Sequence, residues 1–356
     1  MKKRNGLCAI LWLALLSLFG STFAASAPYH VIKRIPISGD SDWDYISADS
    51  EARRLYVPNG TQVVVLDLDS GAVVGKISGL EDAHGVAVAP EFGRGFVDAT
   101  DPGSVTIFDL KTFAVIDKVR VGGDPNGIIY DSKLKRIFTA DRGSKRLTAI
   151  DAKTGKVLGV VDNLDGRTEH LASDGAGHIF LNIQDKGHTL KIDAVSMKVL
   201  DDWTVVPVCG LPSSMDMDRA HNRIFIGCRG GPLAQPPGTS LLAVLDSTTG
   251  KIVATQPIGL GVDALEFDPK TGLIYVSTGG GEGALLIFHE DSLDKYTLVQ
   301  NVKTLPGART MALDHKTGKV YLPVADFGPR PAPTPEKPNP RAPALPGTFS
   351  VLVVGE

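Results

Sequence analysis

The chain has 356 residues, with 37 lysines and arginines against 40 aspartates and glutamates, a net charge of −3 at neutral pH. Without Lys2, Lys3 and Arg4, 34 basic residues face the same 40 acidic ones, and the net charge becomes −6. This balance argues against a general nucleic-acid binder, which needs a basic face for phosphate contacts, although it allows a local basic patch.

The N-terminus has the pattern of a signal peptide. A basic stretch at residues 2–4 precedes the apolar run "LCAILWLALLSLFG", and Thr22 and Ala24 occupy the small-residue positions before a cleavage site. No later stretch is long and apolar enough to span a bilayer. We therefore expect residues 1–24 to be removed, and the mature protein to be a secreted or periplasmic monomer without a membrane span.

Closely related phrases recur along the chain, such as "IDAKTGKVLGVV", which begins at Ile150. The aspartates near their starts are Asp67, Asp109, Asp151, Asp193 and Asp246. They are spaced by 42, 42, 42 and 53 residues. A period near 42 is the length of one four-stranded propeller blade.

A second phrase recurs seven times and consists of an apolar strand, a polar turn and a strand centred on an aromatic residue. The aromatic residues are Tyr56, Phe96, Phe138, Phe180, Phe225, Tyr275 and Tyr321. Each unit thus reads as strand a, strand b, strand c and strand d. One such sheet cannot bury both faces, but seven arranged radially can. The sequence predicts an all-β protein, a seven-bladed β-propeller of antiparallel blades.

The two ends of the chain complete one blade in this prediction. The seventh unit ends at "TFSVLVVGE", which supplies strand c without strand d. The segment His30–Gly39, "HVIKRIPISG", has the strand-d pattern. We expect this N-terminal strand to complete the last blade and close the ring, which removes an exposed sheet edge. Residues 29–356 then form a single propeller domain.

The repeat "GDPNGIIYDSKLKRIFTADRGSKRLTAIDAKTGKVLGVV" resembles that of YVTN/YncE-like β-propeller proteins. Approximate copies of the family core are Tyr56–Asn59, Phe138–Asp141 and Tyr275–Thr278. The resemblance implies a secreted or periplasmic propeller, in a group that includes ligand-binding proteins and one reported binder of single-stranded DNA. Related propellers carry haem, but this chain lacks a C-x-x-C-H motif, so no covalently attached haem is expected.

The residue that begins strand a in each unit should point toward the mouth of the central channel. These seven positions, counted five residues before the end of the strand, are all polar: Asp44, His84, Asn126, Glu169, Ser213, Asp263 and Arg309. His170 takes the place of Glu169 if the register shifts by one residue. The side chains either cap strand ends and hold channel waters or form a functional ring with perturbed pKa values.

The candidate ligand-binding residues are therefore Asp44, His84, Asn126, Glu169, His170, Asp263 and Arg309. They suit a small anionic molecule or a divalent metal ion, whose candidate ligands are Asp44, His84, Glu169 and Asp263. Without a metal, Glu169 or His84 is a candidate general base, with Arg309 steadying an anion. A ligand-binding protein is the leading hypothesis. A metal-dependent hydrolase or lyase and a scaffold for protein or single-stranded DNA stay open, and the sequence identifies no substrate.

Two loops between strands b and c are enlarged, "RGGPLAQPPGTS" in the fifth unit and a proline-rich loop at residues 329–347 in the seventh. They either cover the channel mouth or form a disordered excursion. Trp43 is a candidate stacking surface or inter-blade packing residue. Charged residues of these and similar loops are expected to be ordinary solvated charges. They are Arg142, Asp185, Lys186, Arg229, Glu282 and Asp326.

Two cysteines remain after signal-peptide removal, Cys209 and Cys228. Both fall at the mouth side of the fifth unit, so bridging distance is plausible. An even pair in an exported protein favours a disulfide over two separately buried thiols.

Overall fold

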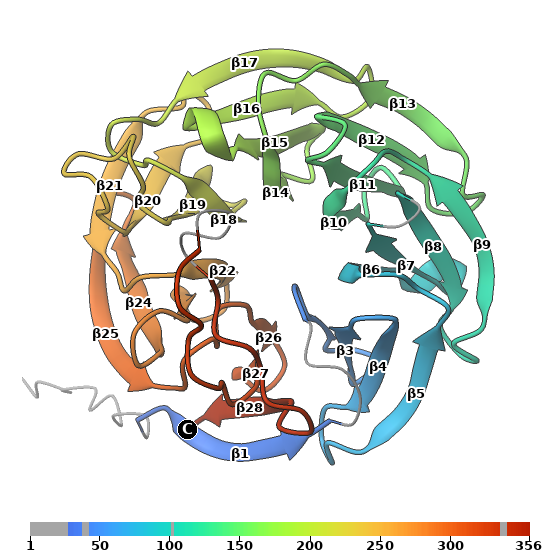
Figure 1. The fold of residues 1–356 in the computed structure, drawn as a ribbon. Coiled ribbons are helices and arrows are strands. Elements are labelled where there is room, and N and C mark those ends of the chain that lie inside the picture. The colour runs from blue at the N-terminus through green and yellow to red at the C-terminus, as the bar shows by residue number, and fades with distance from the viewer. Residues whose placement is uncertain (1–27, 38–42, 101–102, 335–339) are drawn as a thin grey trace, which may run out of the picture.

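A computed structural model of the protein describes residues 28–37, 43–100, 103–334 and 340–356. The predicted signal peptide at residues 1–24 lies outside this range. Seven four-stranded antiparallel sheets are arranged radially around a central axis (Figure 1), which confirms the predicted propeller. The described part contains two short 3-10 helices, η1 (Pro90–Phe92) and η2 (Gln184–Lys186). Neither these nor any other described segment is a helix able to cross a membrane.

The first four blades follow one another along the chain, each ordered from the axis outward. Blade one contains β2 (Ser47–Asp49), β3 (Arg54–Asn59), β4 (Gln62–Asp67) and β5 (Val73–Ser78). Blade two contains β6 (Ala83–Ala89), β7 (Arg94–Ala99), β8 (Ser104–Asp109) and β9 (Val115–Arg120). Blade three contains β10 (Pro125–Asp131), β11 (Arg136–Asp141), β12 (Arg146–Asp151) and β13 (Val157–Val161). Blade four contains β14 (Thr168–Ser173), β15 (His178–Ile183), β16 (His188–Asp193) and β17 (Lys198–Thr204).

The last three blades continue the same order, and the seventh uses both ends of the chain. Blade five contains β18 (Pro212–Asp218), β19 (Arg223–Cys228), β20 (Leu241–Asp246) and β21 (Ile252–Pro257). Blade six contains β22 (Val262–Asp268), β23 (Leu273–Thr278), β24 (Ala284–Ser292) and β25 (Lys295–Lys303). Blade seven contains β26 (Ala312–Asp314), β27 (Lys319–Val324), β28 (Ser350–Gly355) and β1 (His30–Pro36).

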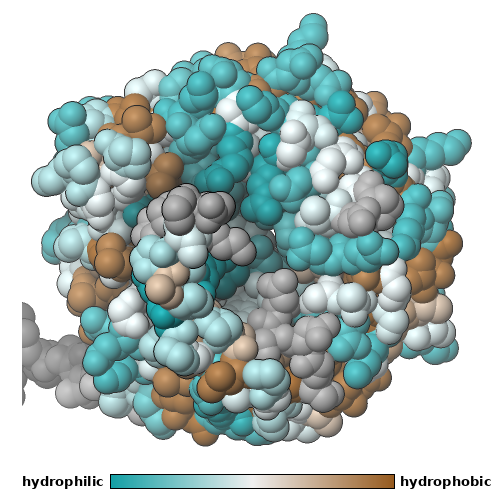
Figure 2. All heavy atoms as spheres, viewed as in Figure 1, coloured by the Kyte–Doolittle hydropathy of each residue, from teal (hydrophilic) through white to brown (hydrophobic). Residues whose placement is uncertain are grey.

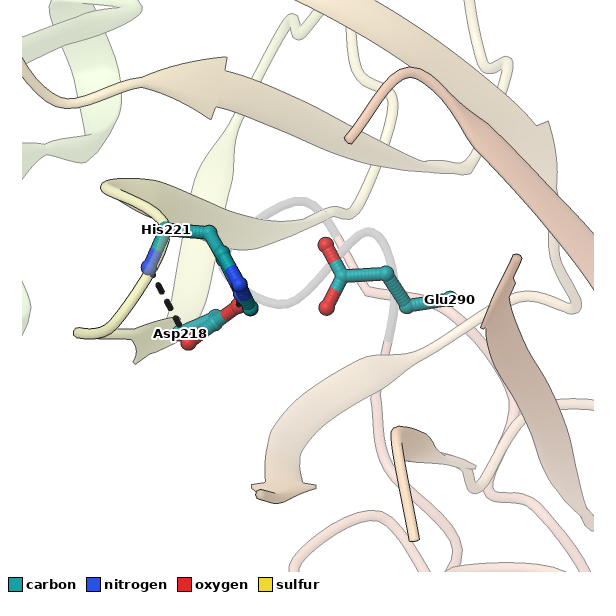
Figure 3. Close-up of side chains that lie close together, drawn as sticks. All are labelled: Asp218, His221 and Glu290. Carbon is teal, nitrogen blue, oxygen red and sulfur yellow. Dashed lines mark hydrogen bonds and ion pairs between the residues drawn. The ribbon is translucent and has the colours of Figure 1, made fainter. Parts of the chain in front are cut away.

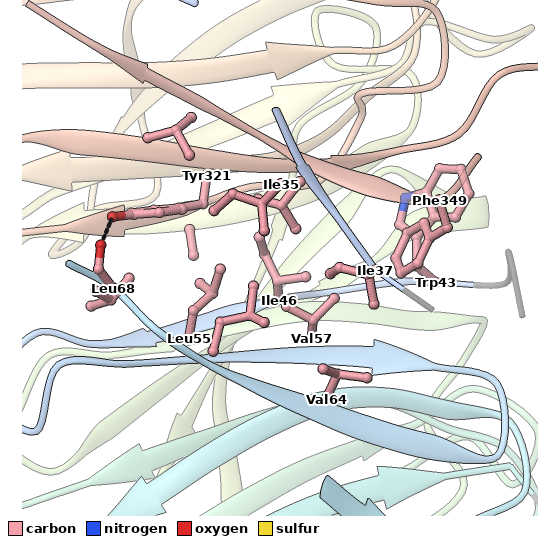
Figure 4. Packing of buried hydrophobic residues seen from close by; sticks show 14 of the residues in the cluster. Ile35, Ile37, Trp43, Ile46, Leu55, Val57, Val64, Leu68, Tyr321 and Phe349 are labelled. Atoms are coloured by element: carbon pink, nitrogen blue, oxygen red, sulfur yellow. Dashed lines mark hydrogen bonds between the residues drawn. The ribbon is translucent and has the colours of Figure 1, made fainter. Parts of the chain in front are cut away.

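Ring closure occurs as the sequence predicts. Strand β1 pairs antiparallel with β28, from His30 opposite Gly355 to Pro36 opposite Ser350, and the two lie together at the rim in Figure 1. The Tyr321 hydroxyl of blade seven donates a hydrogen bond to the Leu68 carbonyl oxygen of blade one, at 3.0 Å (Figure 4). The two ends of the chain are thus joined within the sheet of blade seven, and a hydrogen bond joins blade seven to blade one.

Hydrophobic packing between neighbouring sheets fixes the blade positions. The seven aromatic residues predicted at the centres of the b strands are each no more than 1% exposed. At the junction of blades seven and one, Ile35, Tyr321 and Phe349 pack against Leu55 and Val57 (Figure 4). Because each sheet buries its faces against its neighbours, the apolar surface leaves water only when the ring is complete.

The repeated aspartate phrase forms the turn between strands c and d. In blade three the Asp151 carboxylate accepts hydrogen bonds from the Thr154 hydroxyl and backbone N–H, at 2.7 and 2.6 Å. These bonds lower the pKa of Asp151, the hydroxyl bond first among them. Gly155 follows with φ of +75°, a left-handed conformation that glycine adopts without strain. The turn needs an acceptor, a hydroxyl donor and a left-handed residue in order, which explains the recurrence of the phrase. Phe113 and Met197 take the place of the glycine in blades two and four.

The predicted disulfide between Cys209 and Cys228 is present, with 5.2 Å between the two Cα atoms. It ties the connection before β18 to the end of β19, and both cysteines are fully buried. Arg229 follows Cys228 directly and lies at the channel mouth. The disulfide therefore anchors the backbone that presents this arginine.

Candidate functional site

A cavity of about 260 Å³ lies at the mouth of the central channel, on the face shown in Figures 1 and 2. Figure 2 shows this face hollowed at its centre, with hydrophilic side chains around the hollow. We call it the channel-mouth cavity. Its lining residues are Trp43, Asp44, Tyr45, Asp82, Ala83, His84, Asn126, Arg142, Glu169, Arg229, Asp263, Arg309 and Arg341.

Six of the seven strand-start residues predicted from the sequence line this cavity. They are Asp44, His84, Asn126, Glu169, Asp263 and Arg309. The seventh, Ser213, is fully buried and is held by the Gln184 side-chain amide at 2.9 Å. The blade repeat places equivalent residues at equivalent heights around the axis, which is why side chains distant in sequence meet here.

Asp263 is the centre of an ion bridge across the cavity wall. Its carboxylate pairs with the Arg309 Nε at 2.9 Å and with the Arg229 guanidinium. The Arg309 guanidinium also donates to the Trp43 carbonyl oxygen at 3.1 Å and lies 5.7 Å from the centre of the Trp43 ring. The Trp43 ring itself stacks on Phe349. Trp43 therefore packs between blades, which confirms one of its two predicted roles, and it also contacts Arg309 in the cavity wall.

Two other carboxyl groups in the cavity have raised pKa values. Burial, followed by the nearby Asp263 carboxylate, raises the pKa of Glu169 to about 7, against the opposing effects of Arg229 and Arg167. The same two causes raise the pKa of Asp44 to about 6. Protonation of these side chains therefore changes near neutral pH, as at many functional sites.

His84 is held in one orientation by its neighbours. Its Nδ1 is 2.9 Å from the Pro125 carbonyl oxygen, so Nδ1 carries a proton and donates it. Its Nε2 lies 3.5 Å from an Asp82 carboxylate oxygen. Burial opposes a charge on this ring, but Asp98, Asp44 and Asp82 outweigh it, and the pKa of His84 is raised.

Asn126 offers a polar atom that the surrounding protein does not use. Its side chain is 2% exposed, and its carbonyl Oδ1 has no hydrogen-bond partner among the described residues. Leaving a buried acceptor unpaired costs free energy. A bound ligand with a hydroxyl or an N–H group would satisfy this oxygen.

Three arginines reach the cavity from loops between strands b and c. Arg142 follows β11 and pairs with Asp124, whereas Arg229 follows β19. Arg341 comes from the proline-rich loop between β27 and β28, whose described part passes in front of β22 in Figure 1. The prediction that Arg142 and Arg229 are ordinary solvated charges is therefore wrong, because both line the cavity and pair with aspartates. The other four charged loop residues are not part of its lining: Asp185, Lys186, Glu282 and Asp326.

The candidate metal ligands Asp44, His84, Glu169 and Asp263 do not converge as a preformed metal site. In the described part of the chain, one group of three histidine or carboxylate side chains has ligand atoms within 4.8 Å of one another, and it lies elsewhere. Asp263 is already held by two arginines, and His84 Nδ1 by a backbone carbonyl.

A second cavity, of about 660 Å³, continues along the channel below the mouth. Tyr45 lines both cavities, and its ring centre lies 5.0 Å from that of His170 on blade four. His170 thus lies in the lower cavity rather than at the mouth. Burial lowers its pKa to about 4, so its ring is neutral at physiological pH.

No protein-family model matches the chain, and no curated protein does. Among solved structures, it is similar to hydrazine synthase of Kuenenia stuttgartiensis, at 17% identity and a TM-score of 0.70 over 80% of this chain and 94% of that one. It is also similar to the WD40 repeats of RRP9, at 8% identity and a TM-score of 0.71 over 93% and 98% of the two chains. The β-propeller domain of Cps50 (Swd1) from Myceliophteria thermophila matches at 11% identity and a TM-score of 0.67 over 92% and 100%.

These likenesses show the fold alone, a seven-bladed β-propeller. Such propellers serve in general as ligand-binding proteins or interaction scaffolds, and the fold does not select among chemistries. The resemblance to the YVTN/YncE-like family stays a prediction, because no family model matches.

Proposed function

We propose that this protein binds a small anionic molecule in the channel-mouth cavity. The observation that carries the proposal is the convergence of four arginines, Arg142, Arg229, Arg309 and Arg341, on one cavity of about 260 Å³. Guanidinium groups donate paired hydrogen bonds that match carboxylate and phosphate oxygens. The volume suits a compact ligand better than an extended polymer.

The local charge around Asp263 supports an anion over a cation. Arg229 and Arg309 share the carboxylate of Asp263, which leaves this group of three side chains with one positive charge in excess. Glu169 and Asp44, whose pKa values are raised, lose part of their negative charge near neutral pH and can then donate a hydrogen bond. An anion placed beside them favours their protonated forms still further.

Thermal unfolding with added ligands tests this proposal. Citrate, succinate and inorganic phosphate are compared with magnesium and manganese chloride at matched ionic strength. Ligands that bind the folded state raise the unfolding temperature. We expect one or more of the anions to raise it, and to do so more at pH 6 than at pH 8. A shift with the divalent cations alone, or anion shifts that survive the Arg309→Ala substitution, would contradict the proposal.

Acid–base catalysis by Glu169 is a second candidate function. A pKa of about 7 in a buried carboxyl group is suited to proton transfer at neutral pH. Such catalysis would make Glu169→Gln abolish turnover of an anionic substrate while its binding persists. A variant that retains full turnover would exclude this role.

Export to the periplasm or the medium, and membership of the YVTN/YncE-like family, are also part of the proposal. The disulfide supports export, because such bonds persist in oxidising compartments. Fractionation of cells that express the full-length chain tests this directly. Recovery of the whole chain from the cytoplasm with residues 1–24 intact would contradict export.

A further inference from the structure

On the face opposite the channel mouth, three side chains from two neighbouring blades point toward one another (Figure 3). Asp218 ends β18, His221 lies in the turn that follows, and Glu290 lies near the end of β24 in blade six. One ligand atom of each lies within 4.8 Å of those of the other two. We call these residues the blade-five/six triad.

We propose that the blade-five/six triad binds a divalent transition-metal ion, with Zn²⁺ as the best chemical match. One imidazole nitrogen and two carboxylate oxygens are ligands that Zn²⁺ accepts, and water completes a tetrahedral site. Such ligands bind at about 2.0–2.2 Å, which places ligand atoms about 3–4 Å apart. The exposed His221 and the half-buried Glu290 can close the remaining gap by side-chain rotation.

Comparison with the other blades shows what is unusual about this junction. The aspartate equivalent to Asp218 in blade seven, Asp314, receives Arg53 of the next blade at 2.8 Å. In blade three, Asp131 accepts a hydrogen bond from Ser173 of the next blade. Across the blade junction each of these aspartates faces a donor, whereas Asp218 accepts hydrogen bonds, within the described chain, only from its own turn and faces the Glu290 carboxyl group of blade six. Like charges placed together favour a bound cation or a shared proton.

Among the described residues, no lysine or arginine pairs with the two carboxyl groups of the triad. Arg223, from the same blade, directs its guanidinium to Asp246 at 2.8 Å and to the Leu293 carbonyl oxygen at 2.8 Å. The Tyr296 hydroxyl donates to one oxygen of Glu290 at 3.0 Å and orients that carboxyl group.

The Asp218–His221 pair by itself could be an ordinary cap of the turn. Blade four contains the same kind of pair, Asp174 and His178, with 2.7 Å between the carboxylate and Nδ1. No third ligand joins that pair within the described residues. It is therefore a matched control, alike in its Asp–His contact and different in lacking a counterpart of Glu290.

Zinc titration of the full mature protein, stripped with a chelator and free of any affinity tag, tests the proposal. Calorimetry with ZnCl₂ is run on the wild type, His221→Ala, Glu290→Gln and the control His178→Ala. Co²⁺ absorption reports the ligand geometry independently of activity. Glu290→Gln retains an acceptor for Tyr296, and circular dichroism checks that each variant is folded.

We expect one Zn²⁺ per chain in the wild type and in His178→Ala. His221→Ala should weaken binding by more than the about 10–100-fold that loss of an outer-shell partner causes, and Glu290→Gln should also weaken it. Absence of stoichiometric binding, or equal losses in His221→Ala and His178→Ala, would overturn the proposal. The result is independent of anion binding at the channel mouth, because the two sites share no residue.

Discussion

At the channel mouth four carboxylates meet four arginines and a histidine, whereas on the opposite face two carboxylates and a histidine meet without an arginine. The mouth group arises because the repeat brings equivalent strand starts together, whereas the second group arises where blades five and six pack against each other. The mouth collects the first residues of the a strands and the long b–c loops, and the opposite face collects the last residues and the short turns. The two faces thus carry two candidate sites that differ in charge balance.

Among the contacts that differ between the two faces, the ion bridge at Asp263 should contribute most to stability. Asp263→Ala leaves Arg229 and Arg309 without their shared carboxylate, and we expect the free energy of unfolding to fall by about 3 kcal/mol. Urea unfolding measures this. The control is Asp82→Asn, since asparagine tolerates the φ of +55° at this position. Its half-exposed side chain lines the same cavity, and the change should cost no more than about 0.5 kcal/mol. Equal losses in the two variants would show that the bridge is not special.

Ionised Glu169 should lower the free energy of unfolding at alkaline pH. Its pKa is about 7 in the folded protein against an ordinary 4.5, so the folded state holds a proton that the unfolded chain releases. Stability contributed by this proton is present below pH 4.5 and is lost as the pH rises through 7. Glu169→Gln should therefore raise the free energy of unfolding at pH 8 by about 3 kcal/mol, and by little at pH 4.5. The exposed Glu282→Gln, the control, should change neither value.

The loop arginine at the mouth should affect binding more than stability. Arg341→Ala removes one guanidinium from the cavity and should weaken citrate binding by about tenfold. Arg330→Ala, from the same loop but outside the cavity lining, should leave the affinity unchanged. Calorimetry measures both. Equal affinities of the two variants would remove Arg341 from the site.

The smallest effect is expected on the opposite face in the absence of metal. His221→Ala and His178→Ala should each lower the free energy of unfolding of chelator-treated protein by less than about 1 kcal/mol, since both pairs are partly exposed. Added Zn²⁺ should then raise the free energy of unfolding of the wild type and of His178→Ala, but not that of His221→Ala. Similar unfolding curves for these two proteins with Zn²⁺ would argue against the blade-five/six triad.

The sequence predicts the fold and most of the mouth because both depend on the repeat. Once strand a is aligned, the height of Asp44, Glu169 and Asp263 along the channel follows from the blade geometry. The direction of Arg142 and Arg341 does not follow, because the path of a loop and the reach of a long side chain have no periodicity. The length of the proline-rich loop was the available signal for Arg341.

The blade-five/six triad was missed for a different physical reason. Glu290 belongs to "HEDSLDK", which is not the H-E-x-x-H pattern and so carried no metal prediction by itself. Its partners Asp218 and His221 come from the neighbouring blade, and only packing between blades brings them together. The metal prediction at the mouth did not include the ion pairs between Asp263 and the arginines. The repeat pattern does not show which side chains of different blades pair with one another.

Proton uptake on citrate binding tests the central claim most directly. Calorimetry at pH 7 in phosphate-free buffers of different ionisation enthalpy reports the number of protons exchanged. Anion binding beside Asp44, Glu169 and their neighbours Asp263, His84, Arg229, Arg309 and Arg167 should take up protons, and Glu169→Gln should take up fewer. Binding with proton release, or no binding of citrate, succinate or phosphate at any pH between 5.5 and 8, would contradict an anion site at the channel mouth.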